Sequence, residues 1–143
     1  MGRLMAIDYG RKRCGIAVTD VLQIVATALA TVPTGALDSW VKEYIAREDV
    51  ERIIVGEPRQ MNGEPSESTR YIRPGIERLR RAIGDSVPIE FFDERFTSTL
   101  AHRSMIDAGV KKKDRRDKES VDRIAATIIL NSYLESRNFR TNR

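Results

Sequence analysis

Acidic residues stand at the ends of two apolar segments of the chain. Asp8 follows the apolar residues 4–7, and the pair Asp93 and Glu94 follows a run that ends at Phe92. A charged side chain at the end of a buried strand is costly unless a partner compensates its charge. Because successive strand residues point to opposite faces of a sheet, only one of the two adjacent acids is expected to share a site with Asp8.

A third acid comes from the last apolar segment. Asp122 is expected in the first turn of the final helix, where the helix dipole favours an anion. Its neighbours three and seven positions later, Ala125 and Ile129, are apolar. Since residues at these spacings share one face of a helix, the Asp122 carboxylate is expected to lean toward the sheet.

Each acid also has a purely structural explanation. Asp8 can close its own turn through a side-chain hydrogen bond, and Asp122 can simply stabilise the start of its helix. Glu94 can pair with Arg95 at the surface. If Asp8, one acid of the Asp93–Glu94 pair and Asp122 instead converge, their oxygens suit Mg²⁺ or Mn²⁺, and two such ions about 4 Å apart can hold both reacting oxygens of a phosphodiester. This interpretation makes the three acids catalytic and metal-binding residues of a phosphodiester hydrolase.

The scarcity of cysteine and histidine excludes other kinds of site. The chain of 143 residues has one cysteine, Cys14, and one histidine, His102. No intramolecular disulfide can form, and no zinc cluster of cysteine and histidine can be assembled. The lone histidine also weakens a Ser-His-Asp interpretation. Cys14 lies in an apolar segment and is expected to be a small core residue.

The charge balance favours a polyanionic partner. The net charge is +4 and the isoelectric point is about 9.5, so nucleic acid is the partner expected. The longest apolar runs cover only a few residues, and no membrane association is predicted. The first residues lack the apolar core and cleavage site of a signal peptide, which predicts a cytoplasmic protein.

Basic residues are expected to flank the acids. One group lies in the turn after Asp8, and another precedes Asp122 in a charged connector over residues 110–119. Such bases can hold the phosphates on either side of a scissile bond, whereas a solvated charged loop is the structural alternative. The predicted nucleic-acid-binding residues are Arg11, Lys12, Arg13, Arg95, Lys111, Lys112, Lys113, Arg115 and Arg116.

The apolar patterns predict an α/β fold. Three strands with short links are expected to pair antiparallel, and later strands separated by helices to run parallel. The prediction is a five-stranded mixed sheet flanked by helices, in one domain over residues 1–137 with a flexible tail over 138–143. Pro74 is expected to break or bend its helix, and Val121 to face inward. The expected strands are 4–7, 14–18, 24–32, 52–55 and 87–92, and the expected helices are 37–45, 66–83, 97–109 and one that begins at 119 or 120.

Four motifs, in order, resemble one known family. They are Ala6-Ile7-Asp8-Tyr9-Gly10 through Arg13, Gly15 and Ala17-Val18; Ile54-Val55-Gly56-x-Pro58 with Asn62-Gly63; Asp93-Glu94-Arg95-Phe96-Thr97-Ser98; and Asp122-x-x-Ala125-Ala126 with Ile129-Leu130 and Tyr133-Leu134. Together they resemble the RuvX/YqgF family over residues 4 to about 134. The resemblance implies an RNase H-like fold related to Holliday-junction resolvases, and a nuclease role in maturing the 5′ end of pre-16S ribosomal RNA. By position, it implies that the family's acids fall on Asp8, Glu94 and Asp122.

Glu57 departs from the family pattern, which usually has leucine at this position. The residue follows an apolar strand and lies in the loop expected over residues 56–65. It is either an additional metal ligand or a surface acid, and a solvated side chain is favoured because isolated surface acids are common. Asp93 is a second candidate for an extra ligand.

The resulting prediction is a nuclease that uses two Mg²⁺ or Mn²⁺ ions and acts on structured RNA, as a monomer or a homodimer. Branched DNA is the alternative substrate, as for a junction resolvase. A ribosome-assembly factor that binds nucleic acid without catalysis is the second alternative. An actin-like ATPase, which also begins with an Asp-x-Gly turn, ranks last because it needs a duplicated domain and a second phosphate loop.

Overall fold

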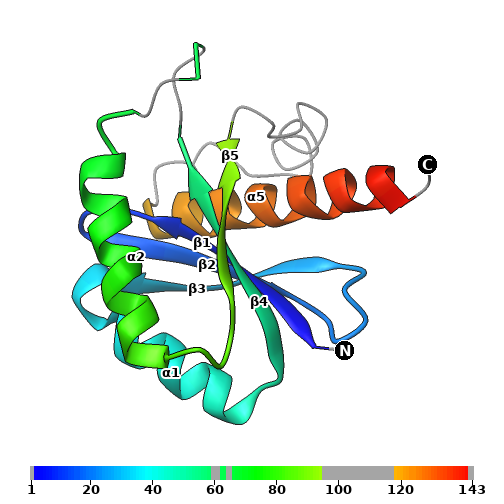
Figure 1. The fold of residues 1–143 in the computed structure, drawn as a ribbon, viewed down its shortest axis with the longest axis horizontal. Helices are drawn as coiled ribbons and strands as arrows, with labels where there is room; N and C mark the ends of the chain where they lie inside the picture. Colours follow the sequence, from blue (N-terminus) through cyan, green and yellow to red (C-terminus); the bar gives the residue numbers. More distant parts are fainter. Residues whose placement is uncertain (1, 59–61, 64–65, 95–117, 142–143) are drawn as a thin grey trace.

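A computed structural model describes residues 2–58, 62–63, 66–94 and 118–141 of the chain (Figure 1). The predicted helix over residues 97–109 lies outside the described residues. The strands are β1 (Arg3–Tyr9), β2 (Arg13–Thr19), β3 (Ala26–Pro33), β4 (Val50–Glu57) and β5 (Ile89–Asp93). The helices are α1 (Leu37–Arg47), α2 (Thr69–Ile83) and α5 (Lys118–Thr141), and a 3₁₀ turn, η1, covers Thr34–Ala36.

The five strands form one mixed sheet in the order β3-β2-β1-β4-β5. β1 pairs antiparallel with β2, and β2 with β3, because the links between them are too short for a crossover. β4 and β5 each follow a helix, and β1, β4 and β5 run parallel. Cys14 on β2 is fully buried, as predicted. The predicted α/β fold, with three antiparallel strands followed by parallel strands, is confirmed.

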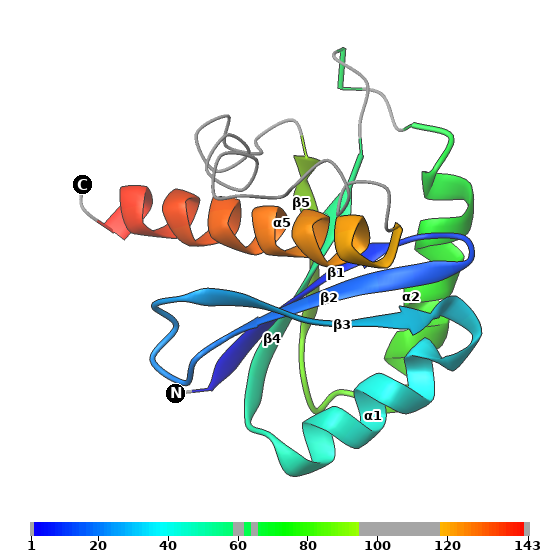
Figure 2. The same cartoon turned by 180° about the vertical axis from the view of Figure 1, so that it is seen from behind.

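Helices cover both faces of the sheet. α1 and α2 pack on one face, and α5 crosses the other (Figure 2). Along β1, Ile7 and Tyr9 belong to the core beneath α1 and α2, whereas Leu4 and Ala6 belong to the core beneath α5. Because side chains alternate along a strand, Asp8 lies on the face that α5 covers.

β4 is longer than its apolar residues predicted. It continues through Glu57, because Gly56 and Glu57 pair with Phe92 and Asp93 of β5. The loop expected over residues 56–65 is therefore wrong at its first two positions. The extension carries Glu57 into the sheet and fixes which face its side chain occupies.

α2 is continuous through Pro74, so a break at this residue is wrong, whereas a bend there stays a prediction. A proline inside a helix removes one backbone donor. The helix is held against the sheet on both sides of that position, by Ile72 before it and by Ile76 and Leu79 after it, all of them buried. Tertiary packing thus outweighs the local loss of one hydrogen bond.

The last helix is also longer than predicted. α5 continues to Thr141, past the boundary expected at residue 137, and residues 142 and 143 lie outside the described part. Val121, expected to face inward, is exposed, because the buried stripe of the helix begins at Ala126. Among the described residues, no helix is both long enough and apolar enough to span a membrane.

Candidate active site

Asp8 lies at the end of β1, on the sheet face that α5 covers. Its backbone partner on β2 is Gly15, and its side chain is half-buried. Burial raises the pKa of the Asp8 carboxyl to about 6, and the negative charge of Asp122 adds to the shift. The carboxyl is therefore costly to ionise in this position, and a nearby cation would remove that cost.

Gly15 allows the start of α5 to approach the sheet closely. A Cβ atom at this position would lie 1.9 Å from the carbonyl oxygen of Asp122, a separation that no side chain can occupy. The close approach brings the Asp122 carboxylate to the end of β1. There, Nε of Arg13 donates a hydrogen bond of 2.7 Å to Oδ2 of Asp122. The carboxylate thus lies against the sheet, as its apolar helical neighbours predicted.

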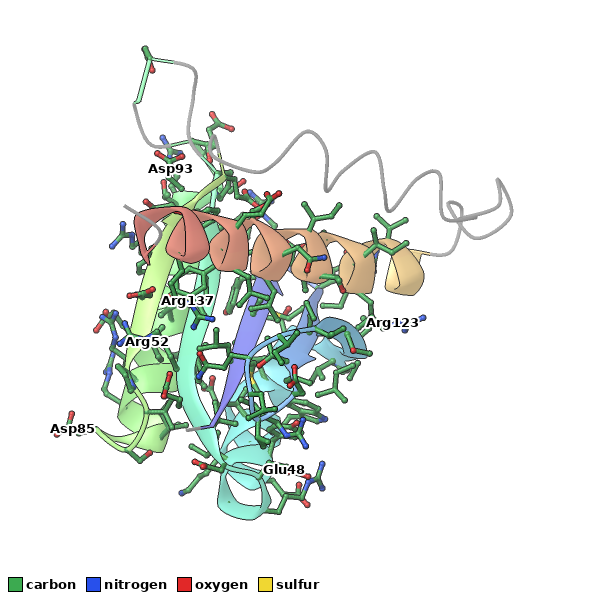
Figure 3. The ribbon with its side chains drawn as sticks, turned by 90° about the vertical axis from the view of Figure 1, so that its right-hand side faces the viewer. Glu48, Arg52, Asp85, Asp93, Arg123 and Arg137 are labelled. Atoms are coloured by element: carbon green, nitrogen blue, oxygen red, sulfur yellow. The ribbon has the colours of Figure 1, made fainter. Side chains whose placement is uncertain are left out.

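Because α5 begins at Lys118, Asp122 lies in its second turn and not in the first turn that the sequence predicted. A second arginine ties this turn to the sheet edge. Nη1 of Arg123 donates to Oγ1 of Thr31 on β3 over 3.3 Å. Figure 3 shows Arg123 at the N-terminal end of α5, beside the strands. Arg13 and Arg123 therefore hold the turn that carries Asp122 from two neighbouring strands.

Gly56 makes room for the third acid. A Cβ atom at Gly56 would lie 2.5 Å from Cδ1 of Ile129 on α5 and 2.8 Å from Oε1 of Glu94. Glu94, which follows β5, therefore lies over Gly56 on the α5 face. Its pKa is raised to about 7, first by burial and then by the negative charges of Asp8 and Asp93.

Asp8 is the residue that connects the three acids. Its charge interacts with Asp122 on one side and with Glu94 on the other. Within the described residues, no three acidic, cysteine or histidine side chains lie close enough together to form a ready-made metal site. The structure therefore brings the acids together as two pairs that share Asp8, rather than as one compact cluster.

The chemistry of the two pairs fits divalent cations. All the side-chain donors are carboxylate oxygens, which are the preferred ligands of Mg²⁺ and Mn²⁺. Burial and mutual repulsion raise the pKa of Asp8 and Glu94. A cation held between such groups would favour their charged forms, so the electrostatics of the site match the binding of a metal.

Glu57 lies on the opposite face of the sheet from Asp8. It is only 3% exposed and forms an ion pair with Arg73 of α2, so the favoured interpretation of a solvated side chain is wrong. Alternation along β4 directs Gly56 toward α5 and Glu57 toward α2, which also separates Glu57 from the Asp8 site. Asp93, its partner on β5, ends that strand in Figure 3 and shares the α2 face.

The basic residues of the β1–β2 turn have different surroundings. Arg13 binds Asp122, as described above. Arg11 is exposed, and its guanidinium lies 5.0 Å from the centre of the Tyr71 ring. Lys12 is exposed. The remaining predicted nucleic-acid-binding residues lie outside the described residues: Arg95, Lys111, Lys112, Lys113, Arg115 and Arg116.

Sequence reasoning missed two features of the site. It gave no structural role to Gly15 and Gly56, although a glycine inside an apolar strand signals close approach of another backbone or side chain. It also missed the basic character of α2, whose sequence TRYIRPGIERLRRAI holds five arginines and one glutamate. The spacing of Arg70 and Arg78 along that helix was the available signal.

Comparison with known proteins identifies relatives along almost the whole chain. A protein of Phocaeicola vulgatus is 58% identical over 139 residues, covering 97% of this chain and 99% of the relative. One from Bacteroides thetaiotaomicron is 55% identical over 139 residues, covering 97% of this chain and 100% of the relative. Both are named "Putative pre-16S rRNA nuclease".

A solved structure shares the fold. It is described as "T. thermophilus RuvC in complex with Holliday junction substrate", and it matches with a TM-score of 0.60 and 18% sequence identity over 96% of both chains. The likeness confirms the predicted RNase H-like fold. The family described as RuvX, Holliday junction resolvase, matches residues 2–136, and the chain belongs to this family.

Proposed function

We propose that this protein is a metal-dependent nuclease that hydrolyses phosphodiester bonds in the 5′-end maturation of pre-16S ribosomal RNA. The observation that carries the proposal is the position of Asp8. Its carboxyl is half-buried between two further acids, and its pKa is raised to about 6. Strongly perturbed acids that face one another are typical of catalytic sites.

Asp8, Asp122 and Glu94 would hold the divalent cations with their carboxylate oxygens. When bound, Mg²⁺ or Mn²⁺ activates a water molecule and stabilises the charge that develops on the phosphate. Hydrolysis adds water across the P–O bond, so one oxygen joins phosphorus and the leaving oxygen takes up a proton. Glu94, with its pKa raised to about 7, can hold a proton near neutral pH.

Arg13 would act as a positioning residue. Its hydrogen bond of 2.7 Å fixes Oδ2 of Asp122. Because the carboxylate is rigid, this contact also restricts the position of the other oxygen. Arg11 and Lys12, exposed in the same turn, would contact phosphates of the substrate. Cytoplasmic residence and the oligomeric state, monomer or homodimer, stay predictions.

The names of the relatives support RNA as the substrate. Two proteins more than half identical to this chain are named for pre-16S rRNA. Branched DNA is the second candidate substrate, because the family description names the Holliday junction and the RuvC structure contains one.

The deciding experiment compares cleavage of an end-labelled pre-16S leader RNA and of a four-way DNA junction, in Mn²⁺ or in EDTA. The variants are Asp8→Asn and, as a matched control, Asp85→Asn, an exposed acid at the other end of the sheet (Figure 3). We expect the protein to cut the RNA only when metal is present. This cleavage should disappear in Asp8→Asn and persist in Asp85→Asn.

Other outcomes redirect the proposal. Cutting of the junction alone would replace RNA by branched DNA as the substrate. Tight RNA binding without cutting of either substrate in Mn²⁺ would overturn the nuclease and favour a non-catalytic assembly factor.

A further inference from the structure

A pocket lined by arginine and tyrosine lies on the face of the sheet opposite Asp8, Asp122 and Glu94. It has a volume of about 270 Å³ and opens between the β1–β2 turn and the start of α2. None of the described residues that line it is acidic. The lining residues are Tyr9, Arg11, Thr34, Arg70, Tyr71 and Arg78.

The three arginines of this pocket are exposed. The ion pairs that α2 forms in the described part of the chain use other arginines, since Arg73 pairs with Glu57 and Arg80 with Glu77. Asp38, in the first turn of α1, is an acid whose charge reaches Tyr9. Because the described lining residues include three guanidinium groups and no acid, the pocket is positively charged, which favours an anionic ligand.

The aromatic side chains give this positive pocket a defined shape. Tyr9 and Tyr71 lie with their ring centres 6.4 Å apart, and Nη2 of Arg78 donates to the Tyr9 hydroxyl over 3.4 Å. Gly75 of α2 leaves space for Tyr9, because a Cβ atom there would lie 2.0 Å from its hydroxyl oxygen. The Arg11 guanidinium is held over the Tyr71 ring at 5.0 Å. Guanidinium donors beside an aromatic surface suit the phosphates and bases of a nucleic-acid strand.

We infer that this pocket binds a backbone phosphate of the nucleic-acid substrate, away from the scissile bond, with Arg11, Arg70 and Arg78 as donors. The inference rests on the proposed function, because it assigns the pocket to the same substrate. Tyr9 directly follows Asp8 on β1, and the two side chains leave opposite faces of the sheet. A strand that passes around the β1–β2 turn therefore reaches both.

The acids and the pocket lie on opposite faces of the sheet, so one phosphate cannot reach both. The pocket would therefore bind a phosphate several nucleotides from the scissile one. A substrate that ends close to the scissile bond cannot fill the pocket.

The experiment measures binding of labelled single-stranded leader RNA in EDTA over a series of salt concentrations. The test variant is Arg70→Gln/Arg78→Gln, and the matched control is Lys42→Gln/Arg81→Gln, which removes two exposed positive charges of the same helical layer outside the pocket. The test variant is expected to bind roughly tenfold more weakly, with a log–log salt slope reduced by about 0.7 for each phosphate that the protein no longer binds. Arg70→Lys/Arg78→Lys should recover most of the slope.

Equal weakening in the test and control variants would overturn the inference, because it would mean that only net charge matters. Circular dichroism melting of each variant separates a binding defect from unfolding. Since metal is absent, the result does not depend on cleavage. Weaker binding by the test variant supports the pocket even if the protein cuts no substrate. If the wild-type protein cuts RNA but the test variant binds RNA as tightly as wild type, the inference about the pocket is wrong and the proposed nuclease function stands.

Discussion

At the carboxyl ends of β1 and β4, the two faces of the sheet surround their acids in opposite ways. On the α5 face, Asp8 has acids as neighbours, and its pKa is raised to about 6. On the α2 face, Glu57 is more deeply buried but pairs with the guanidinium of Arg73. The burial of an acid beside a cationic side chain is explained by the ion pair that the two form. A buried acid beside other acids lowers stability, and such arrangements cluster at functional sites.

Replacing Asp8 should have the largest effect on cleavage. The same replacement should lower activity but raise stability. Asp8→Asn is expected to lower metal-dependent cleavage by more than about 100-fold, since even residues behind a ligand can cost 10–100-fold. In EDTA at neutral pH, the same change should raise the free energy of unfolding by about 2 kcal/mol, because the amide has no charge to desolvate. Cleavage assays and urea denaturation measure the two effects. A loss of both activity and stability would instead give Asp8 a structural role like that of Glu57.

Adding one methyl group where α5 meets β2 should reduce cleavage nearly as much as Asp8→Asn does. In Gly15→Ala, the new Cβ would lie 1.9 Å from the Asp122 carbonyl oxygen, so α5 must shift. We expect destabilisation of about 1–3 kcal/mol or more, together with reduced cleavage. Gly35→Ala is the control, because a Cβ there meets no atom within 4 Å. Thermal unfolding of both variants tests the prediction, and equal melting temperatures would contradict the close approach.

The stability of the metal-free protein should fall as pH rises. Asp8 and Glu94 have folded pKa values of about 6 and about 7, above the ordinary values for their residue types. Each therefore binds its proton more tightly in the folded state, so stability is lost between about pH 4 and about pH 7.

Denaturation in EDTA at about pH 5 and about pH 7.5 measures this change, which should amount to a few kcal/mol at most. The double variant Asp8→Asn/Glu94→Gln should show a flatter profile, and Mn²⁺ should restore wild-type stability at the higher pH. A wild-type profile identical to that of the double variant would show that the α5 face carries no such electrostatic cost.

Replacing the acid on the other face should have the smallest effect. Glu57→Leu, which gives the residue usual in the family, is expected to leave cleavage within about twofold of wild type and stability within about 1 kcal/mol. The change removes a buried charge, and the Arg73 guanidinium left without its partner is half exposed to water. A large loss of cleavage with unchanged stability would place Glu57 in the catalytic site and erase the distinction between the two faces.

Much of this arrangement is visible in short stretches of sequence. The acids at strand ends, the alternation that separates Asp93 from Glu94, and the apolar neighbours of Asp122 all depend on residues a few positions apart. Strand and helix order follows from the same local periodicity. The point at which a helix or strand ends was less predictable. Packing carries α2 past Pro74, and strand pairing extends β4 to Glu57.

Only the tertiary structure decided how these residues meet. The neighbours of Asp8 come from segments more than eighty residues away along the chain, Glu94 and Asp122, and the register of β1 with β2 and β4 sets the face on which each lies. The same register turned Glu57 toward Arg73, and it placed Tyr9 and Arg11 beside Arg70 and Arg78 of α2. Local sequence sets the periodicity of each element, but a shift of one residue in strand pairing exchanges the two faces, and that choice depends on the packing of the whole sheet.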